Sequence, residues 1–86
     1  MNNIDVDVAL LLGEEANRQV FNQILKNRKV QLRELIETGY SRERIKKVLT
    51  NLKKYNLIGE KASTFDEFNT YYITAEGLQI GRKISF

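Results

Sequence analysis

Apolar residues recur at helical spacing in three stretches of the chain, over residues 14–26, over 31–38 and from Arg42 to about Tyr55. At about 100° per residue, the apolar positions of each stretch fall on one face. The pattern therefore predicts three amphipathic helices around a common core. Their inward residues are Val20, Phe21, Ile24 and Leu25, then Leu32, Leu35 and Ile36, then Ile45, Val48, Leu49, Leu52 and Tyr55.

A short turn separates the second predicted helix from the third. Gly39 is well placed to take the left-handed conformation that ends a helix. Ser41 can then accept backbone N–H bonds as the N-cap of the third helix, with Glu43 in its first turn. The pattern predicts two helices joined by a tight turn.

A strand pair is predicted after the third helix. Asn56 suits a left-handed cap, Leu57-Ile58 begins a strand, residues 63–69 hold no long apolar run, and residues 70–74 return as a second strand. Two helices joined by a turn and followed by a hairpin make a winged helix-turn-helix. The predicted fold class is α+β, mainly α: a three-helix core plus a two-stranded β-hairpin wing, with extra N- and C-terminal helical segments.

The ends of the chain carry weaker patterns. Residues 4–12 fit both an alternating strand and a helix, and we favour a helix because the segment runs towards a definite one. Val30 is a candidate for one short strand beside the wing. Thr74 can cap a last helix, although Gly77 and Gly81 weaken that prediction. We expect an N-terminal segment, residues 1–13, as a dimerisation element, and a winged helix-turn-helix domain over residues 14–86.

Composition narrows the function classes. The 86 residues suffice for one small domain and include no Cys and no His, which removes thiolate chemistry, the commonest general base and the commonest metal ligands. No phosphate loop or nucleophile elbow is present. We therefore expect no enzyme, no metal and no cofactor. The longest apolar run, Val8 to Leu12, is too short to span a bilayer, so the expectation is a cytoplasmic protein without a membrane association.

Charge is distributed unevenly along the chain. Residues 1–16 carry four acids and no base, whereas residues 17–61 carry twelve bases against four acids, within a net charge of +3. Lys and Arg gain affinity for a duplex by displacing counterions from phosphates. Since the bases coincide with the predicted helix-turn-helix, double-stranded DNA is the expected partner.

Three segments resemble known regulators. Residues 49–58 (LTNLKKYNLI) resemble the end of the recognition helix and the start of the wing in winged-helix regulators, and residues 72–77 (YITAEG) resemble the closing strand and helix start of the MarR and PadR types. Residues 12–25 are more loosely similar to the first helix of ArsR-type repressors. Metal sensing through Cys or His does not carry over, since the sequence has neither residue, and we expect the long dimerisation helices of MarR-type regulators to be missing or reduced.

The resemblance implies a DNA-binding module, usually dimeric, that inserts its third helix in a major groove. Arg44 and Lys47 would then suit guanine and Asn51 adenine, while Ser41 and Thr50 could bond phosphates or bases. The candidate contacts carried over or placed nearby are Ser41, Arg42, Glu43, Arg44, Lys46, Lys47, Thr50, Asn51 and Lys54, with Arg28, Lys29 and Lys61 as further cations.

The wing differs from what a minor-groove reader needs. Its tip carries Asp66 and Glu67, which would be repelled by phosphates, so we expect it to stay outside the minor groove. Phe65 and Phe68 either fold back onto the core or remain exposed for a protein partner. Of Tyr71 and Tyr72, one is expected in the core and one on the surface.

Two functions follow from these patterns. The leading one is sequence-specific binding of duplex DNA by a small dimeric transcription regulator, using helix 42–55. The homodimer would be built from the apolar residues at both termini. The alternative is a protein–protein interaction or adaptor module that uses the acidic, Phe-bearing wing.

Overall fold

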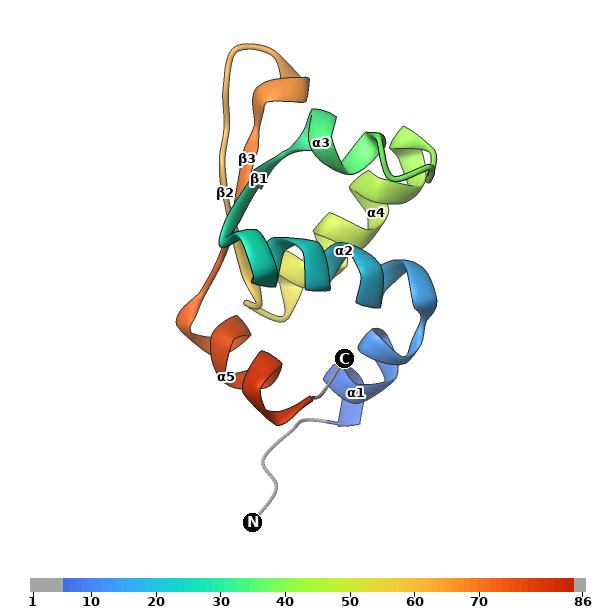
Figure 1. Ribbon diagram of the computed structural model, residues 1–86, viewed down its shortest axis with the longest axis vertical. Helices are drawn as coiled ribbons and strands as arrows, with labels where there is room; N and C mark the ends of the chain where they lie inside the picture. Colours follow the sequence, from blue (N-terminus) through green and yellow to red (C-terminus); the bar gives the residue numbers. More distant parts are fainter. Residues whose placement is uncertain (1–5, 85–86) are drawn as a thin grey trace.

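The computed structural model describes residues 6–84. Five α-helices and three strands follow one another along this part of the chain (Figure 1). In chain order they are α1 (Val6–Gly13), α2 (Glu15–Asn27), β1 (Lys29–Gln31), α3 (Leu32–Ile36), α4 (Arg42–Lys54), β2 (Ile58–Lys61), the short 3-10 helix η1 (Asp66–Phe68), β3 (Thr70–Ile73) and α5 (Ala75–Lys83). The ambiguous N-terminal segment is therefore a helix from Val6 onward, and its first residues lie outside the described part.

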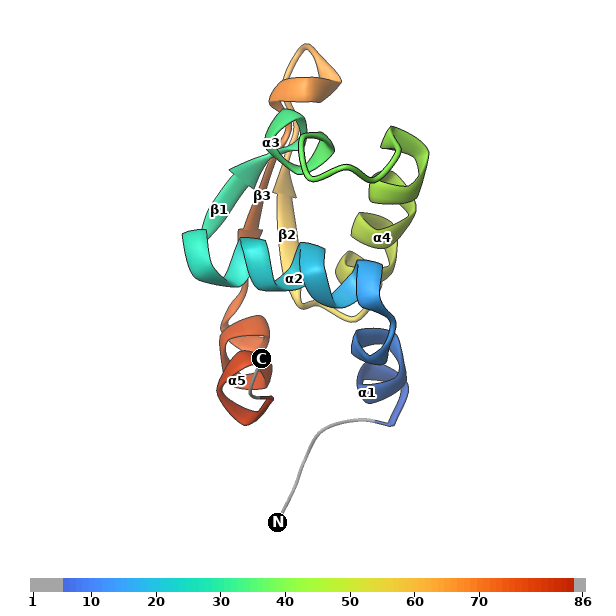
Figure 2. The same cartoon turned by 45° about the vertical axis from the view of Figure 1, so that its right-hand side comes forward.

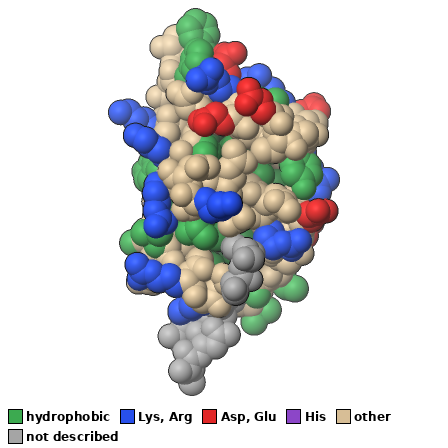
Figure 3. All heavy atoms as spheres, viewed as in Figure 1, with side chains coloured by type: hydrophobic (Ala, Val, Ile, Leu, Met, Phe, Trp, Pro, Cys, Tyr) green, Lys and Arg blue, Asp and Glu red, His purple; other side chains and the backbone are tan. Residues whose placement is uncertain are grey.

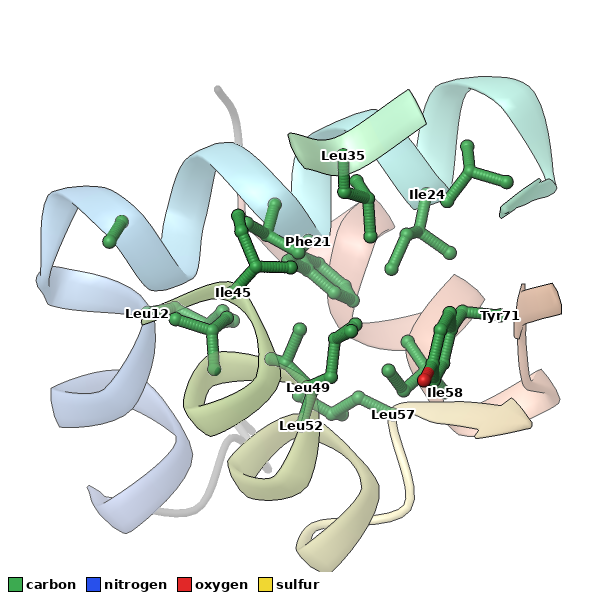
Figure 4. Packing of buried hydrophobic residues seen from close by; sticks show 14 of the residues in the cluster. Leu12, Phe21, Ile24, Leu35, Ile45, Leu49, Leu52, Leu57, Ile58 and Tyr71 are labelled. Carbon is green, nitrogen blue, oxygen red and sulfur yellow. The ribbon is translucent and has the colours of Figure 1, made fainter. Parts of the chain in front are cut away.

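The three predicted core helices are confirmed as α2, α3 and α4. Their inward residues meet those of β2 and β3 in one core, with Phe21 of α2 near its centre (Figure 4). Of the predicted inward set, Leu25, Ile36 and Tyr55 are only half-buried and pack against the edge of this core. Because the apolar face of α4 packs against the core, its opposite face points towards solvent.

The second helix is shorter than predicted. Instead of spanning residues 31–38, α3 begins at Leu32 and ends at Ile36. Gln31 ends strand β1 and caps the helix, and its backbone N–H donates to Glu34 Oε2 at 2.7 Å. At the other end the Thr38 hydroxyl donates to the Leu35 carbonyl at 2.6 Å, which satisfies a terminal carbonyl and closes the helix early.

Both predicted left-handed residues and the predicted cap are confirmed. Gly39 has φ +105° and Asn56 has φ +61°. Ser41 Oγ accepts the backbone N–H of Arg44 at 3.1 Å, as an N-cap does. The turn of residues 37–41 therefore sets the orientation of α4 relative to α3.

The sheet has three antiparallel strands in the order β1-β3-β2. Val30 of β1 lies opposite Tyr71, so the short strand expected at Val30 extends the two-stranded wing. Tyr71 is buried, whereas Tyr72 on the opposite face is 44% exposed, as expected for neighbours on a strand. The arrangement is the predicted winged helix-turn-helix.

Helix α5 forms although it contains two glycines. Both glycines lie where α5 packs too closely against its neighbours to accommodate a larger side chain. A Cβ added to Gly77 would lie 2.2 Å from the Leu57 carbonyl oxygen, and one added to Gly81 would lie 2.7 Å from a methyl group of Leu25. Thr74 Oγ1 accepts the Gly77 N–H at 2.9 Å and begins the helix, as predicted. The glycines that weaken helix propensity therefore allow α5 to dock.

Helices α1 and α5 lie at the end of the molecule opposite the wing tip (Figures 1 and 2). Val8 and Leu12 of α1 are buried against the core. The C-terminal carbonyls of α1 are satisfied from α2: Asn17 Nδ2 donates to Leu11 O at 2.8 Å and Arg18 Nη1 to Gly13 O at 3.0 Å. This contact fixes the direction of α1 relative to α2.

Candidate nucleic-acid interface

The outer face of α4 is polar and open to solvent. Most of the predicted contact residues lie on this one helix face. The buried apolar face of α4 packs against the core and so orients these residues towards solvent. Exposed members are Ser41, Arg42, Glu43, Arg44, Lys46, Lys47, Thr50 and Lys54, with Asn51 half-buried. This face has two flanks, one towards the wing and one towards the start of α2.

Acidic groups of the wing hold the cations on the wing flank. Lys46 Nζ lies 2.9 Å from Asp66 Oδ2, and Arg42 Nη2 lies 3.9 Å from the same oxygen. The hydrogen bond from Lys46 lowers the pKa of Asp66 below its ordinary value. Asp66 is therefore an ion-pair partner of α4, a role that the sequence did not reveal.

A second acid acts further along the same flank. Lys53 Nζ lies 2.6 Å from Glu60 Oε1, and Tyr71 Oη donates to Glu60 Oε2 at 2.8 Å. These hydrogen bonds, that of Lys53 foremost, lower the pKa of Glu60. The set Lys53, Glu60 and Tyr71 ties the end of α4 to strands β2 and β3, and sequence reasoning did not include it.

The flank towards α2 is hollowed. Arg44, Lys47 and Asn51 line a depression together with Glu14 and Asn17 at the start of α2. Within residues 6–84, neither Arg44 nor Lys47 makes an ion pair. Glu14 shares the hollow, where its carboxylate accepts a hydrogen bond from Asn17 at 3.2 Å. The two cations are thus available to an anion approaching from outside.

Three other candidates on α4 already have contacts within the chain. Thr50 Oγ1 donates to the Lys46 carbonyl at 3.0 Å, and Ser41 Oγ is engaged as the N-cap. Lys54 Nζ lies 5.7 Å from the centre of the Tyr55 ring. Each hydroxyl oxygen retains a lone pair, so these contacts do not prevent a bond to a phosphate or a base.

The candidates outside α4 are not all brought to its outer face. Arg28 has φ +70°, and its Nη1 donates to the Leu25 carbonyl at 3.0 Å, so it ends α2. Lys29 begins β1, which is the sheet edge away from α4, because α4 packs against β2 at the other edge (Figure 2). Lys61, at the exposed end of β2, is on the nearer strand.

Of the two alternatives for the wing phenylalanines, the structure shows the exposed one, and the favoured packing onto the core is wrong. Phe65 is 61% and Phe68 is 41% exposed. Their rings meet edge to face at 6.5 Å, and the Arg33 guanidinium lies 5.7 Å from the centre of the Phe68 ring. The hairpin holds its tip beyond the core, where η1 contacts α3 and Asp66 contacts α4, and Figure 3 shows hydrophobic and charged side chains together at this end.

Comparison with known proteins identifies the fold. No protein-family model matches the sequence, and no curated protein does. The reduced form of the transcriptional regulator YodB from B. subtilis matches with TM-score 0.76 at 18% identity, over 96% of this chain and 84% of that one. A transcriptional regulator homologue from Pyrococcus horikoshii OT3 matches with TM-score 0.76 at 15% identity, over 85% and 75%. The fold is that of a winged helix-turn-helix domain.

A third match is the PcaV transcriptional regulator from Streptomyces coelicolor, with TM-score 0.68 and 20% identity over 95% of this chain and 74% of that one. These solved structures are of transcriptional regulators. Within residues 6–84, no three acidic side chains group as a metal site. Over the same residues, no helix is long and apolar enough to cross a bilayer.

Proposed function

We propose that this winged helix-turn-helix domain is a transcription regulator that binds duplex DNA sequence-specifically by inserting α4 in a major groove. The observation that carries the proposal is the division of α4 into a buried apolar face and an exposed polar face rich in cations. Arg44 and Lys47 have the chemistry to donate to guanine O6 and N7, and Asn51 to pair with adenine. The likeness in fold to transcriptional regulators supports it.

We further propose that the regulator acts as a homodimer through α1. Val6 is 71% and Leu10 is 69% exposed, on the side of α1 opposite its buried residues, and Ala9 and Gly13 beside them are exposed too. A helix that is apolar on both sides is normally covered on both. In a symmetric dimer the same strip of a second copy would cover it. The two α4 helices should then lie about 34 Å apart to reach successive major grooves.

The apolar surface available at the C-terminal end is smaller than the sequence suggested. Ile80 and Ile84 of the last segment pack against the protein's own core, as do Val8 and Leu12 of α1. Phe86 lies outside the described residues. The dimer proposal therefore rests on Val6 and Leu10.

Selection from a random duplex pool at two salt concentrations tests both parts of the proposal. We expect recovery of inverted repeats, since a two-fold dimer contacts two equal half-sites. The logarithm of the affinity should fall linearly with the logarithm of salt, with a slope of about 0.9 per phosphate neutralised. Recovery of unrelated sequences would contradict specificity, and recovery of single half-sites would contradict the dimer.

The adaptor function is not favoured. Two of its candidate groups have partners within the chain, since Asp66 is bound to α4 and Phe68 contacts Arg33. The solved structures with this fold named above are transcriptional regulators.

A further inference from the structure

The wing tip is a fixed structure. The Asn69 side chain is buried, and its Oδ1 accepts the Ser63 backbone N–H at 2.7 Å. The Asn69 carbonyl accepts the N–H of Leu32, the first residue of α3, at 3.0 Å. The Phe68 ring contacts Arg33 of the same helix. These contacts tie η1 to α3 and hold Asp66 in place beside α4.

Asp66 sits where an incoming phosphate would have to bind the wing flank. Its Oδ2 atom contacts Lys46 at 2.9 Å and lies 3.9 Å from Arg42. A carboxylate and a phosphate oxygen use the same donors on these side chains. A phosphate placed on Lys46 would therefore meet a negative charge already bound there.

On the opposite flank the one acid that lines the hollow, Glu14, accepts a hydrogen bond from Asn17 and forms no ion pair with the cations there within residues 6–84. Arg44 and Lys47 make no ion pair within the described residues, and the hollow they line with Asn51 opens towards α2. A duplex would gain counterion release from these two cations without first breaking an ion pair. The two flanks differ in availability although the sequence gives both of them basic residues.

We propose that Asp66 determines which side of α4 contacts DNA: it occupies Lys46 and Arg42, and directs the duplex to the flank of Arg44, Lys47 and Asn51. The inference rests on the proposed DNA-binding function and adds a specificity-determining residue to it. Lys46, a candidate backbone contact in the sequence, then contributes little to affinity while Asp66 is present.

The salt dependence of DNA binding by charge-neutral variants tests this proposal. Affinity of the full chain for a short duplex of mixed sequence is followed by fluorescence anisotropy across a salt series. Lys46→Gln and Lys47→Gln are compared in the wild-type chain and in an Asp66→Asn background. Glu67→Gln is the matched control. It removes the same charge at the next residue, and the Glu67 side chain makes no ion pair within residues 6–84.

In the wild-type chain, Lys47→Gln should reduce the slope of log affinity against log salt by about 0.9, and Lys46→Gln should leave it unchanged. Asp66→Asn should steepen the slope, and Lys46→Gln in that background should lower it by about 0.9. Circular dichroism checks that each variant is folded. Glu67→Gln should keep the wild-type slope.

Two results would overturn the proposal while leaving DNA binding intact. Equal losses of slope from Lys46→Gln and Lys47→Gln in the wild-type chain would mean that phosphates displace Asp66. Identical behaviour of Asp66→Asn and Glu67→Gln would mean that the ion pair is irrelevant. If no form of the chain binds duplex at low salt, the proposed function fails, and this inference fails with it.

Discussion

Helices α1 and α4 bury similar inward faces but present opposite outward faces. α4 turns charged and polar side chains outward, whereas α1 turns Val6 and Leu10 outward, and Asp7 is its one charged residue. The inward faces build the fold, so they say little about function. The outward faces distinguish a surface suited to a polyanion from one suited to another apolar surface.

The largest expected effect separates the two faces of α1. Leu12→Ala, at a residue 3% exposed, should lower the free energy of unfolding by about 3 kcal/mol because it leaves a cavity in the core. Leu10→Gln, two positions earlier, should leave the helix content unchanged and should shift the chain towards monomer, since it makes the exposed strip polar.

Chemical denaturation at fixed protein concentration measures the first effect, and sedimentation equilibrium measures the second. A Leu10→Gln variant with the oligomeric state of the wild type would show that α1 does not form the dimer. A Leu12→Ala variant as stable as the wild type would contradict the packing of α1 on α2.

The next effect concerns the outward face of α4. Lys47→Glu should weaken binding to duplex DNA by more than about tenfold, because it replaces an attraction to a phosphate or base with a repulsion. Lys29→Glu is the matched control, with the same change of charge on strand β1 away from α4. Anisotropy titrations at low salt compare the two, and an equal loss in both variants would mean that only net charge matters.

The parts of the fold that depend on local pattern were predictable. Ser41, Asn56 and Thr74 act within a few residues of their own position, and the faces of α2 and α4 follow from helical spacing. Gly77 shows the limit of local reasoning. It lowers helix propensity, and the reason a glycine is needed there is the close approach of the Leu57 carbonyl, which is distant in sequence.

The parts of the site that depend on distant segments were not predictable. Lys46 and Asp66 are 20 residues apart, and their contact requires the position of η1 on α3. Composition alone suggested that Asp66 only repels DNA. Likewise, nothing in the sequence placed β1 at the outer edge of the sheet, so Lys29 was grouped with cations that it does not join.

A smaller effect is expected at the start of α4. Ser41→Ala removes the oxygen that accepts the Arg44 N–H and should lower the free energy of unfolding by about 1 kcal/mol. Ser63→Ala, at an exposed serine of the wing, is the control and should have almost no effect. Urea denaturation measures both. Equal stability of the two variants would show that the cap does not stabilise α4.

The last effect is confined to high pH and concerns the hydrogen bonds that anchor α4 to the sheet. Burial, with the hydrogen bond to Glu60, raises the pKa of Tyr71 to about 12. The protonated phenol is favoured in the folded state, so its contribution is complete below the unfolded pKa of about 10 and is lost as pH rises towards 12. Thermal unfolding between those pH values should therefore show a steeper loss of stability in the wild type than in Tyr71→Phe. Tyr72→Phe, which changes the exposed neighbour, should retain the wild-type slope, and a Tyr71→Phe slope equal to it would contradict the coupling of Tyr71 to the α4 anchor.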